Sequence, residues 1–126
     1  MPVVGIGGFF FRAKDPAKLK AWYREQLGVG GGLGTGAQGQ SNPFCWYHEG
    51  GPMVFEPFPE DSDYFPANRT AMVNLRVRGL AELLERLRAS GTEPMNEQWD
   101  TEAGSFARIH DPEGNPIELW EPPAGA

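Results

Sequence analysis

The same order of secondary-structure elements is predicted twice along the 126-residue chain. In each half a strand is followed by a helix and then by further strands. Alternating apolar residues bounded by glycine- or proline-rich turns predict strands at residues 4–13, 43–48, 52–58, 70–77, 92–98, 105–110 and 116–121. Each half is too small to bury its own sheet. The halves must therefore pack on one another or pair with those of a second chain.

Two helices complete the pattern. Asp15 followed by Pro16 is typical of a helix start, since aspartate caps free N–H groups and proline suits the first helical position. Apolar residues then recur at helical spacing until Gly28, a natural stop. The second helix is predicted over residues 80–89, with leucines on one face. We therefore expect an α+β fold in one domain, residues 1–126, made of two modules at about 1–58 and 70–122.

The two modules are joined by residues 59–69, an acidic, proline-flanked linker. Residues 28–40 carry seven glycines and are predicted to be a loop or weak strand. Their Gly-x-Gly-x-x-Gly segment opens no helical pattern, so a dinucleotide site is not expected. Residues 111–115, Asp-Pro-Glu-Gly-Asn, have strong turn chemistry and predict a tight connection between the last two strands.

Composition excludes several classes of protein. Eleven basic residues against seventeen acidic ones give a net charge of −6, which is unsuited to nucleic acid. No apolar run approaches the length of a membrane span, and the first residues lack the features of an export signal, so we expect a cytoplasmic protein that contacts no membrane. The single Cys45 excludes an intramolecular disulfide and a cysteine-based zinc site.

Three segments carry a family resemblance: Phe11-Arg-Ala-Lys-Asp-Pro with the helix behind it, Val73-Asn-Leu-Arg-Val77, and the long run from Phe106 to Trp120. They resemble the vicinal-oxygen-chelate superfamily, which includes glyoxalases, bleomycin resistance proteins and extradiol dioxygenases. The resemblance implies two βαβββ modules that form curved mixed sheets around a cavity. It also implies a homodimer and, in many members, a divalent metal held by two histidines and two glutamates.

The metal positions implied by the resemblance are poorly filled. The two histidine positions fall on Gly8 and Met72, and methionine is too soft a ligand for the metals concerned. Only the carboxylate positions, Glu56 and Glu118, are retained. We therefore expect no metal and no cofactor. The alternative is a weakly bound Mg²⁺ or Mn²⁺ held by these two carboxylates, with His48 as a third ligand.

The strand alternation indicates which side chains face the cavity. Val73, Leu75 and Val77 are expected to pack under the helices, so their neighbours face the opposite way. The same reasoning on the other strands gives nine candidate ligand-binding residues: Phe10, Arg12, Trp46, Met72, Asn74, Arg76, Phe106, Arg108 and Trp120. A buried carboxylate without a metal needs another cation. We expect one of the arginines to pair with Glu118 or Glu56.

Three functions fit this reading. The first is binding of an apolar or aromatic small molecule in the cavity, with sequestration or resistance as its purpose. The second is enzymatic: a metal-dependent lyase, isomerase or dioxygenase with a carboxylate-rich ligand set, or metal-free chemistry with Glu118 as general base. The third is a purely structural dimerisation module. Fold resemblance does not decide among them, and the sequence leaves enzymatic activity open.

Overall fold

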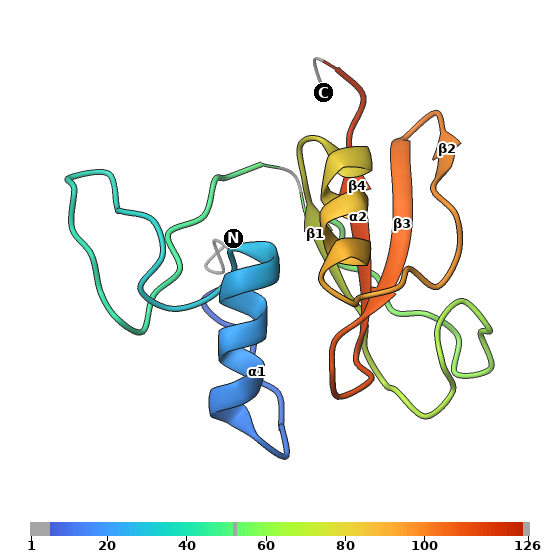
Figure 1. The fold of residues 1–126 in the computed structure, drawn as a ribbon, viewed down its shortest axis with the longest axis horizontal. Helices are drawn as coiled ribbons and strands as arrows, with labels where there is room; N and C mark the ends of the chain where they lie inside the picture. The colour runs from blue at the N-terminus through green and yellow to red at the C-terminus, as the bar shows by residue number, and fades with distance from the viewer. Residues whose placement is uncertain (1–5, 52, 125–126) are drawn as a thin grey trace.

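Four short strands of the computed structural model, which describes residues 6–51 and 53–124, form one open mixed sheet (Figure 1). The strands are β1 (Val73–Arg76), β2 (Trp99–Thr101), β3 (Gly104–His110) and β4 (Pro116–Glu121). Their order across the sheet is β1-β4-β3-β2. β1 runs parallel to β4, and the other two pairs are antiparallel. The structure thus has the predicted mixed α and β composition.

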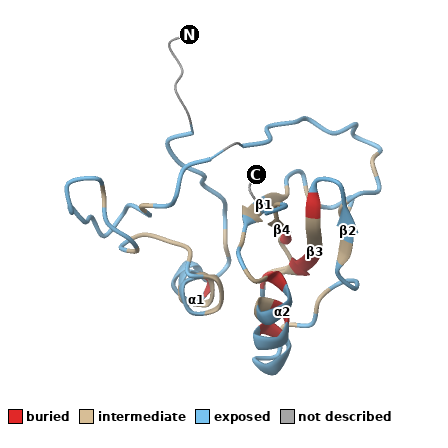
Figure 2. Ribbon diagram, turned by 90° about the horizontal axis from the view of Figure 1, so that it is seen from above, coloured by how far each residue is buried: buried red, intermediate tan, exposed pale blue. Residues whose placement is uncertain are grey.

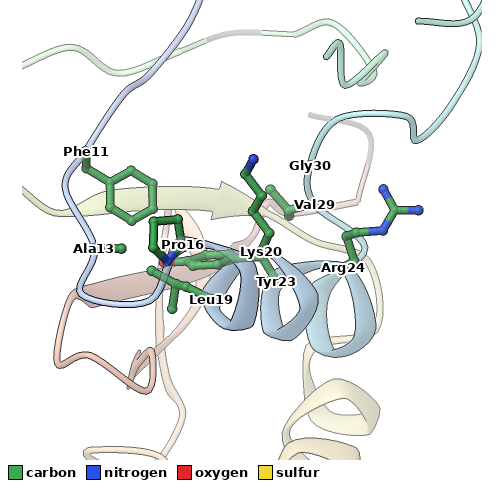
Figure 3. Close-up of a pocket in the computed structure, with 9 residues that line it drawn as sticks. All are labelled: Phe11, Ala13, Pro16, Leu19, Lys20, Tyr23, Arg24, Val29 and Gly30. Carbon is green, nitrogen blue, oxygen red and sulfur yellow. The ribbon is translucent and has the colours of Figure 1, made fainter. Parts of the chain in front are cut away.

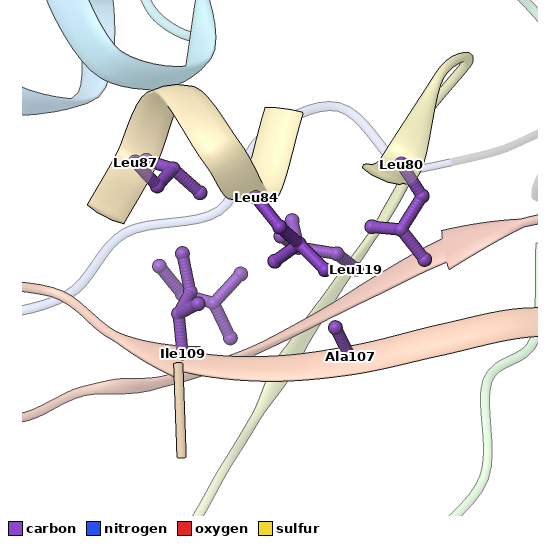
Figure 4. Packing of buried hydrophobic residues seen from close by; sticks show 7 residues of the cluster. Leu80, Leu84, Leu87, Ala107, Ile109 and Leu119 are labelled. Carbon is purple, nitrogen blue, oxygen red and sulfur yellow. The ribbon is translucent and has the colours of Figure 1, made fainter. Parts of the chain in front are cut away.

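Helix α2 (Leu80–Ala89) covers one face of this sheet and has the bounds that the sequence predicts. Its leucines point toward the sheet, where they meet alternate residues of β3 and β4 (Figure 4). The core cluster consists of Leu80, Leu84, Leu87, Ala107, Ile109, Ile117 and Leu119. Buried residues gather on α2, β3 and β4 (Figure 2). The predicted packing of Val73, Leu75 and Val77 against this core is confirmed.

The first helix is also confirmed, and it divides into α1 (Pro16–Trp22) and a π-helical turn η1 (Tyr23–Leu27). The Asp15 side chain accepts a hydrogen bond from the N–H of Lys18, which caps the helix. The helix ends at Gly28, whose φ of 68° is a left-handed conformation that glycine adopts at low cost. No helix among residues 6–51 and 53–124 is long and apolar enough to cross a membrane.

The strands predicted for the first module are not formed in the described residues. Residues 6–13, 43–51 and 53–58 belong to no strand, and residues 43–44 form a turn. The loop that follows α1, cyan to green in Figure 1, lies apart from the four-stranded sheet. Residues 4, 5 and 52 of these predicted strands lie outside the described part of the chain. Alternation of apolar residues reports one-sided burial, but a strand also needs a neighbour for its backbone groups. The arrangement of two modules around a cavity therefore stays a prediction.

One strand of the second half is also misplaced by the sequence. The prediction at residues 92–98 is wrong, because the strand lies at Trp99–Thr101. The two-residue turn between Thr101 and Gly104 sets this register, pairing Trp99 with Phe106. A Cβ on Gly104 would lie 2.2 Å from the carbonyl oxygen of Glu121, so only glycine fits this turn without a shift of the backbone.

A partly buried hydrogen bond attaches the first helix to the turn before β4. The Tyr23 hydroxyl donates to Asp111 Oδ2 at 2.8 Å. Asp111, only 4% exposed, also accepts from the N–H groups of Glu113 and Asn115 and from the Asn115 amide. Burial and then the hydrogen bond to Asp111 raise the pKa of the Tyr23 hydroxyl well above its ordinary value. The folded protein therefore holds this proton more tightly than the unfolded chain does.

Replacing Tyr23 with phenylalanine is expected to lower the free energy of unfolding by about 1 kcal/mol near pH 7, the net value of one hydrogen bond. The raised pKa makes this contribution fully present below about pH 10, the ordinary pKa of tyrosine. Above that pH the unfolded chain releases the proton, and the advantage of the wild type falls by about 1.4 kcal/mol per pH unit. Urea unfolding of both proteins between pH 7 and 11 measures the difference. A difference that stays constant up to pH 11 would contradict this assignment.

Candidate functional site

Six of the predicted site residues share the sheet face that points away from α2. Their neighbours in sequence fill the core on the other face, and side chains alternate along a strand. The six residues are Asn74, Arg76, Phe106, Arg108, Glu118 and Trp120. The strand register places them in two rows that cross the sheet. One row is polar and the other is mainly aromatic.

The polar row consists of Asn74, Glu118 and Arg108, which lie opposite one another on β1, β4 and β3. The Asn74 amide donates to Glu118 Oε1 at 2.9 Å. An Arg108 guanidinium nitrogen lies 3.7 Å from Glu118 Oε2, and both side chains are about nine-tenths buried. The expected pairing of an arginine with Glu118 is therefore confirmed. Such a pair removes the cost of burying the carboxylate alone.

Tyr64 from residues 59–69 lies over the polar row. Its hydroxyl donates to Glu118 Oε2 at 2.5 Å, and the Arg108 guanidinium carbon lies 4.6 Å from the centre of its ring. Arg108 also donates to the backbone carbonyl of Tyr64. Burial, followed by the hydrogen bond to Glu118, raises the pKa of the Tyr64 hydroxyl. The carboxylate oxygens of Glu118 thus have three polar neighbours from three different segments.

The aromatic row consists of Trp120, Phe106 and Trp99 on β4, β3 and β2. Adjacent ring centres are 6.3 and 5.5 Å apart, and the rings are nearly parallel, with interplanar angles of 9° and 16°. This spacing follows from the distance between paired strands. The Trp120 indole N–H donates to the Ala103 carbonyl at 2.7 Å, which fixes the orientation of the ring. All three side chains are half-buried, so the row presents aromatic surface to solvent.

Two residues of this face were not predicted as ligand-binding. The sequence pattern predicts a strand at residues 92–98 and so leaves Trp99 outside the sheet, whereas β2 begins at Trp99. Tyr64 lies in the linker, where its position relative to the cavity could not be decided. The sequence signal for both residues is their aromatic type, which does not indicate the residues that they contact in the fold.

The other predicted site residues lie elsewhere in the described structure. Met72 directly precedes β1. The remaining five belong to the exposed segments of the first half: Phe10, Arg12, Trp46, His48 and Glu56. The ring centres of His48 and Trp46 are 4.9 Å apart. The structure brings none of these five into a hydrogen bond or ion pair with the polar row in the described chain.

The residues present do not fit the divalent metal that the sequence resemblance implies. Glu118 is engaged by Tyr64, Asn74 and Arg108, and the guanidinium lies where it would repel a cation. In the described ranges no three histidine, cysteine, aspartate or glutamate side chains gather closely enough to hold an ion. The expectation of no cofactor stays a prediction, and no chemical step is assigned to a metal.

A shallow apolar pocket of about 170 Å³ lies on α1, away from both rows (Figure 3). Phe11 folds over Leu19 and Tyr23, and the Lys20 and Arg24 side chains stand at its rim. The Phe11 and Tyr23 rings meet edge to face at 6.1 Å. Phe11 lines this pocket and is still 47% exposed to solvent.

The geometry of the open face suits binding of a flat molecule. The aromatic row offers ring surface and edges, and the buried Arg108–Glu118 pair lies in the row beside it. Both Glu118 oxygens already accept hydrogen bonds. A carboxylate so engaged is poorly placed to remove a proton from a substrate.

Comparisons with known proteins show which family model and which solved structures this chain is similar to. A family described as a glyoxalase-like domain matches residues 8–120. No curated protein matches the sequence. The solved structure of TnmS3, an antibiotic-binding protein from Streptomyces sp. CB03234, is similar over 98% of this chain and 99% of that one, with a TM-score of 0.61 and 22% identity.

Two further solved structures show weaker similarity. An integron cassette protein from the mobile metagenome of V. cholerae has a TM-score of 0.44 at 18% identity, covering 88% of this chain and 97% of that one. A virulence protein from Salmonella typhimurium has a TM-score of 0.46 at 18% identity, covering 92% and 100%.

Proposed function

Since the chain belongs to the glyoxalase-like domain family, within the vicinal-oxygen-chelate superfamily, we propose that it binds an apolar or aromatic small molecule on the open face of its sheet. The observation that carries the proposal is the aromatic row beside the buried Arg108–Glu118 pair of the polar row. Three near-parallel rings give a flat ligand stacking surface, and the fixed Arg108–Glu118 pair gives it a defined orientation.

A purpose in sequestration or resistance is consistent with the similarity to TnmS3, which is itself an antibiotic-binding protein. That similarity supports small-molecule binding by this fold and leaves the identity of the ligand to experiment. Binding without turnover is further supported by the engagement of Glu118 on both oxygens. We propose that the protein needs no metal for this task, because Arg108 supplies the cation beside the carboxylate.

We further propose that the binding site is completed in a homodimer. The second wall would come from the first half of the partner, which carries Phe10, Arg12 and Trp46. In this chain Phe10 is 94% exposed and Trp46 is 37% exposed. Aromatic side chains of an unpaired segment are costly to leave in water, and a second copy offers a sheet face that they can cover.

Calorimetric titration with naphthalene-2-carboxamide, a flat uncharged probe, tests the proposed function. We expect binding to the wild type and about tenfold weaker binding to Trp120→Ala, because stacking on an aromatic ring and the buried area both contribute. Cyclohexanecarboxamide is the matched control probe, since it lacks a flat ring and is expected to bind more weakly than the naphthalene compound. Equal affinity of the probe for the wild type and for Trp120→Ala would refute the assignment of the site to this face.

A further inference from the structure

The place that Tyr64 occupies has the features of a binding site for a phenol. Its hydroxyl donates to Glu118, while its ring lies under the Arg108 guanidinium, 4.6 Å from the guanidinium carbon. A carboxylate that accepts from a hydroxyl and a cation over a ring face are the two interactions that a free hydroxylated aromatic molecule would make there. The side chain itself comes from outside the sheet.

The segment that carries Tyr64 is attached to the rest of the molecule by side chains: Arg69 donates to the carbonyls of Glu113 and Gly114, and Arg108 donates to the carbonyl of Tyr64. Residues 59–69, which we name the strap, contain turns and no helix or strand. Tyr64 is 40% exposed although its hydroxyl reaches a buried carboxylate. The centre of its ring also lies 5.5 Å from the ring centre of Phe58, a residue at the end of the exposed first half. A segment that is held by side chains and pairs with no strand can move without breaking the sheet.

We propose that Tyr64 is an internal stand-in for the ligand: a hydroxylated aromatic molecule takes the place of its phenol between Glu118 and Arg108, and the strap moves aside. The inference rests on the proposed function and narrows its ligand class to aromatic molecules with a hydroxyl group. The Glu118 carboxylate selects the hydroxyl, Arg108 covers the ring, and the neighbouring aromatic row contacts the rest of the molecule. Tyr64 lowers the apparent affinity by competing for the same place.

The test uses p-cresol, which is the tyrosine side chain as a free molecule. The full chain with Tyr64→Ala is titrated with p-cresol and, in parallel, with 4-methylanisole, which has the same ring but no hydroxyl to donate. Nuclear magnetic resonance of the tryptophan indole N–H groups reports binding next to Trp120 and Trp99. We expect Tyr64→Ala to bind p-cresol about tenfold more tightly than 4-methylanisole, the effect of one hydrogen bond to a charged acceptor.

Three comparisons identify the cause of binding. Tyr64→Ala is expected to bind p-cresol more tightly than the wild type, because the competing phenol is gone. Tyr64→Phe keeps the ring but frees Glu118, so its affinity is expected to lie between the two; this milder change remains informative if Tyr64→Ala folds poorly. Tyr47→Phe removes a hydroxyl from a tyrosine that has no contact with Glu118 in the described structure, and it is expected to bind like the wild type.

The preference for the hydroxyl must also depend on Glu118. Adding Glu118→Gln to Tyr64→Ala is expected to bring the affinities for p-cresol and 4-methylanisole close together. Equal affinity of Tyr64→Ala for both compounds, or no gain over the wild type, would overturn the inference. Naphthalene-2-carboxamide separates the two proposals: if its binding still depends on Trp120 while p-cresol binds no variant, the stand-in role fails and the proposed function stands.

Discussion

The protein is expected to sediment as a dimer, at twice the 13.9 kDa of one chain. The reason is the distribution of exposed apolar side chains. Twelve large hydrophobic residues are exposed in the described structure, and all but Tyr64 and Met95 lie within residues 6–58. Single exposed apolar residues are common, but this many on one stretch of chain mark an interaction surface. A second copy is the proposed occupant, since each half needs a partner sheet.

Phe55→Asp tests this expectation. Phe55 is 76% exposed and lies in one of the segments predicted as a strand. A charge there must be desolvated in the dimer, whereas in a free chain it stays in water, so the change is expected to shift the protein toward monomer at micromolar concentration. Sedimentation equilibrium measures the shift, with circular dichroism as a check on folding.

Met95→Asp is the matched control, because Met95 is 54% exposed but lies outside the first half. It is expected to leave the mass unchanged. A wild type that sediments as a monomer over the same concentrations would contradict the dimer proposal, and so would loss of the dimer in Met95→Asp alone.

The second half of the fold could be predicted because its signals are local. The leucine spacing gave α2 to the residue, and the turn at 111–115 gave the strands on either side of it. Alternation then assigned faces correctly: Ile109 and Ile117 are fully buried, while Arg108 and Glu118 meet on the opposite face. Period-two patterning is sufficient here because β2, β3 and β4 pair with near neighbours in the sequence, and β1 joins β4 at the edge of the sheet that they form.

The first half shows the limit of the same reasoning. The alternation in residues 4–13 predicts that Phe9 and Phe11 pack while Phe10 faces the cavity, yet Phe9 and Phe11 are 60% and 47% exposed in the single chain. Alternation indicates that one face of a segment is buried, but it does not indicate whether the same chain or a second chain packs against that face. Tyr64 shows a related limit, because its contact with Glu118 spans 54 residues and depends on how the strap folds back. Long-range contacts made by irregular segments leave no periodic signal.

Replacing Arg108 with methionine is expected to lower the free energy of unfolding by about 3 kcal/mol, because it leaves Glu118 buried without its cation. The loss is larger than that of one hydrogen bond because Arg108 also holds the carbonyl and ring of Tyr64. Glu118→Met is expected to be similarly harmful, since it removes the acceptor for Tyr64, Asn74 and Arg108. Chemical unfolding at pH 7 measures both variants.

The double variant decides whether the two residues act as a pair. If the main cost in each single variant is an uncompensated buried group, Arg108→Met with Glu118→Met removes both charges and recovers much of the stability. Costs that simply add would show that the two side chains stabilise the fold independently.

The exposed ion pair between Arg78 and Glu49 is the matched control, because both side chains lie in solvent, at 82% and 76% exposure. Arg78→Met is expected to change stability little, since water already solvates each partner and screens their attraction. A large loss there, together with a small loss for Arg108→Met, would show that burial does not govern the energetics of the polar row.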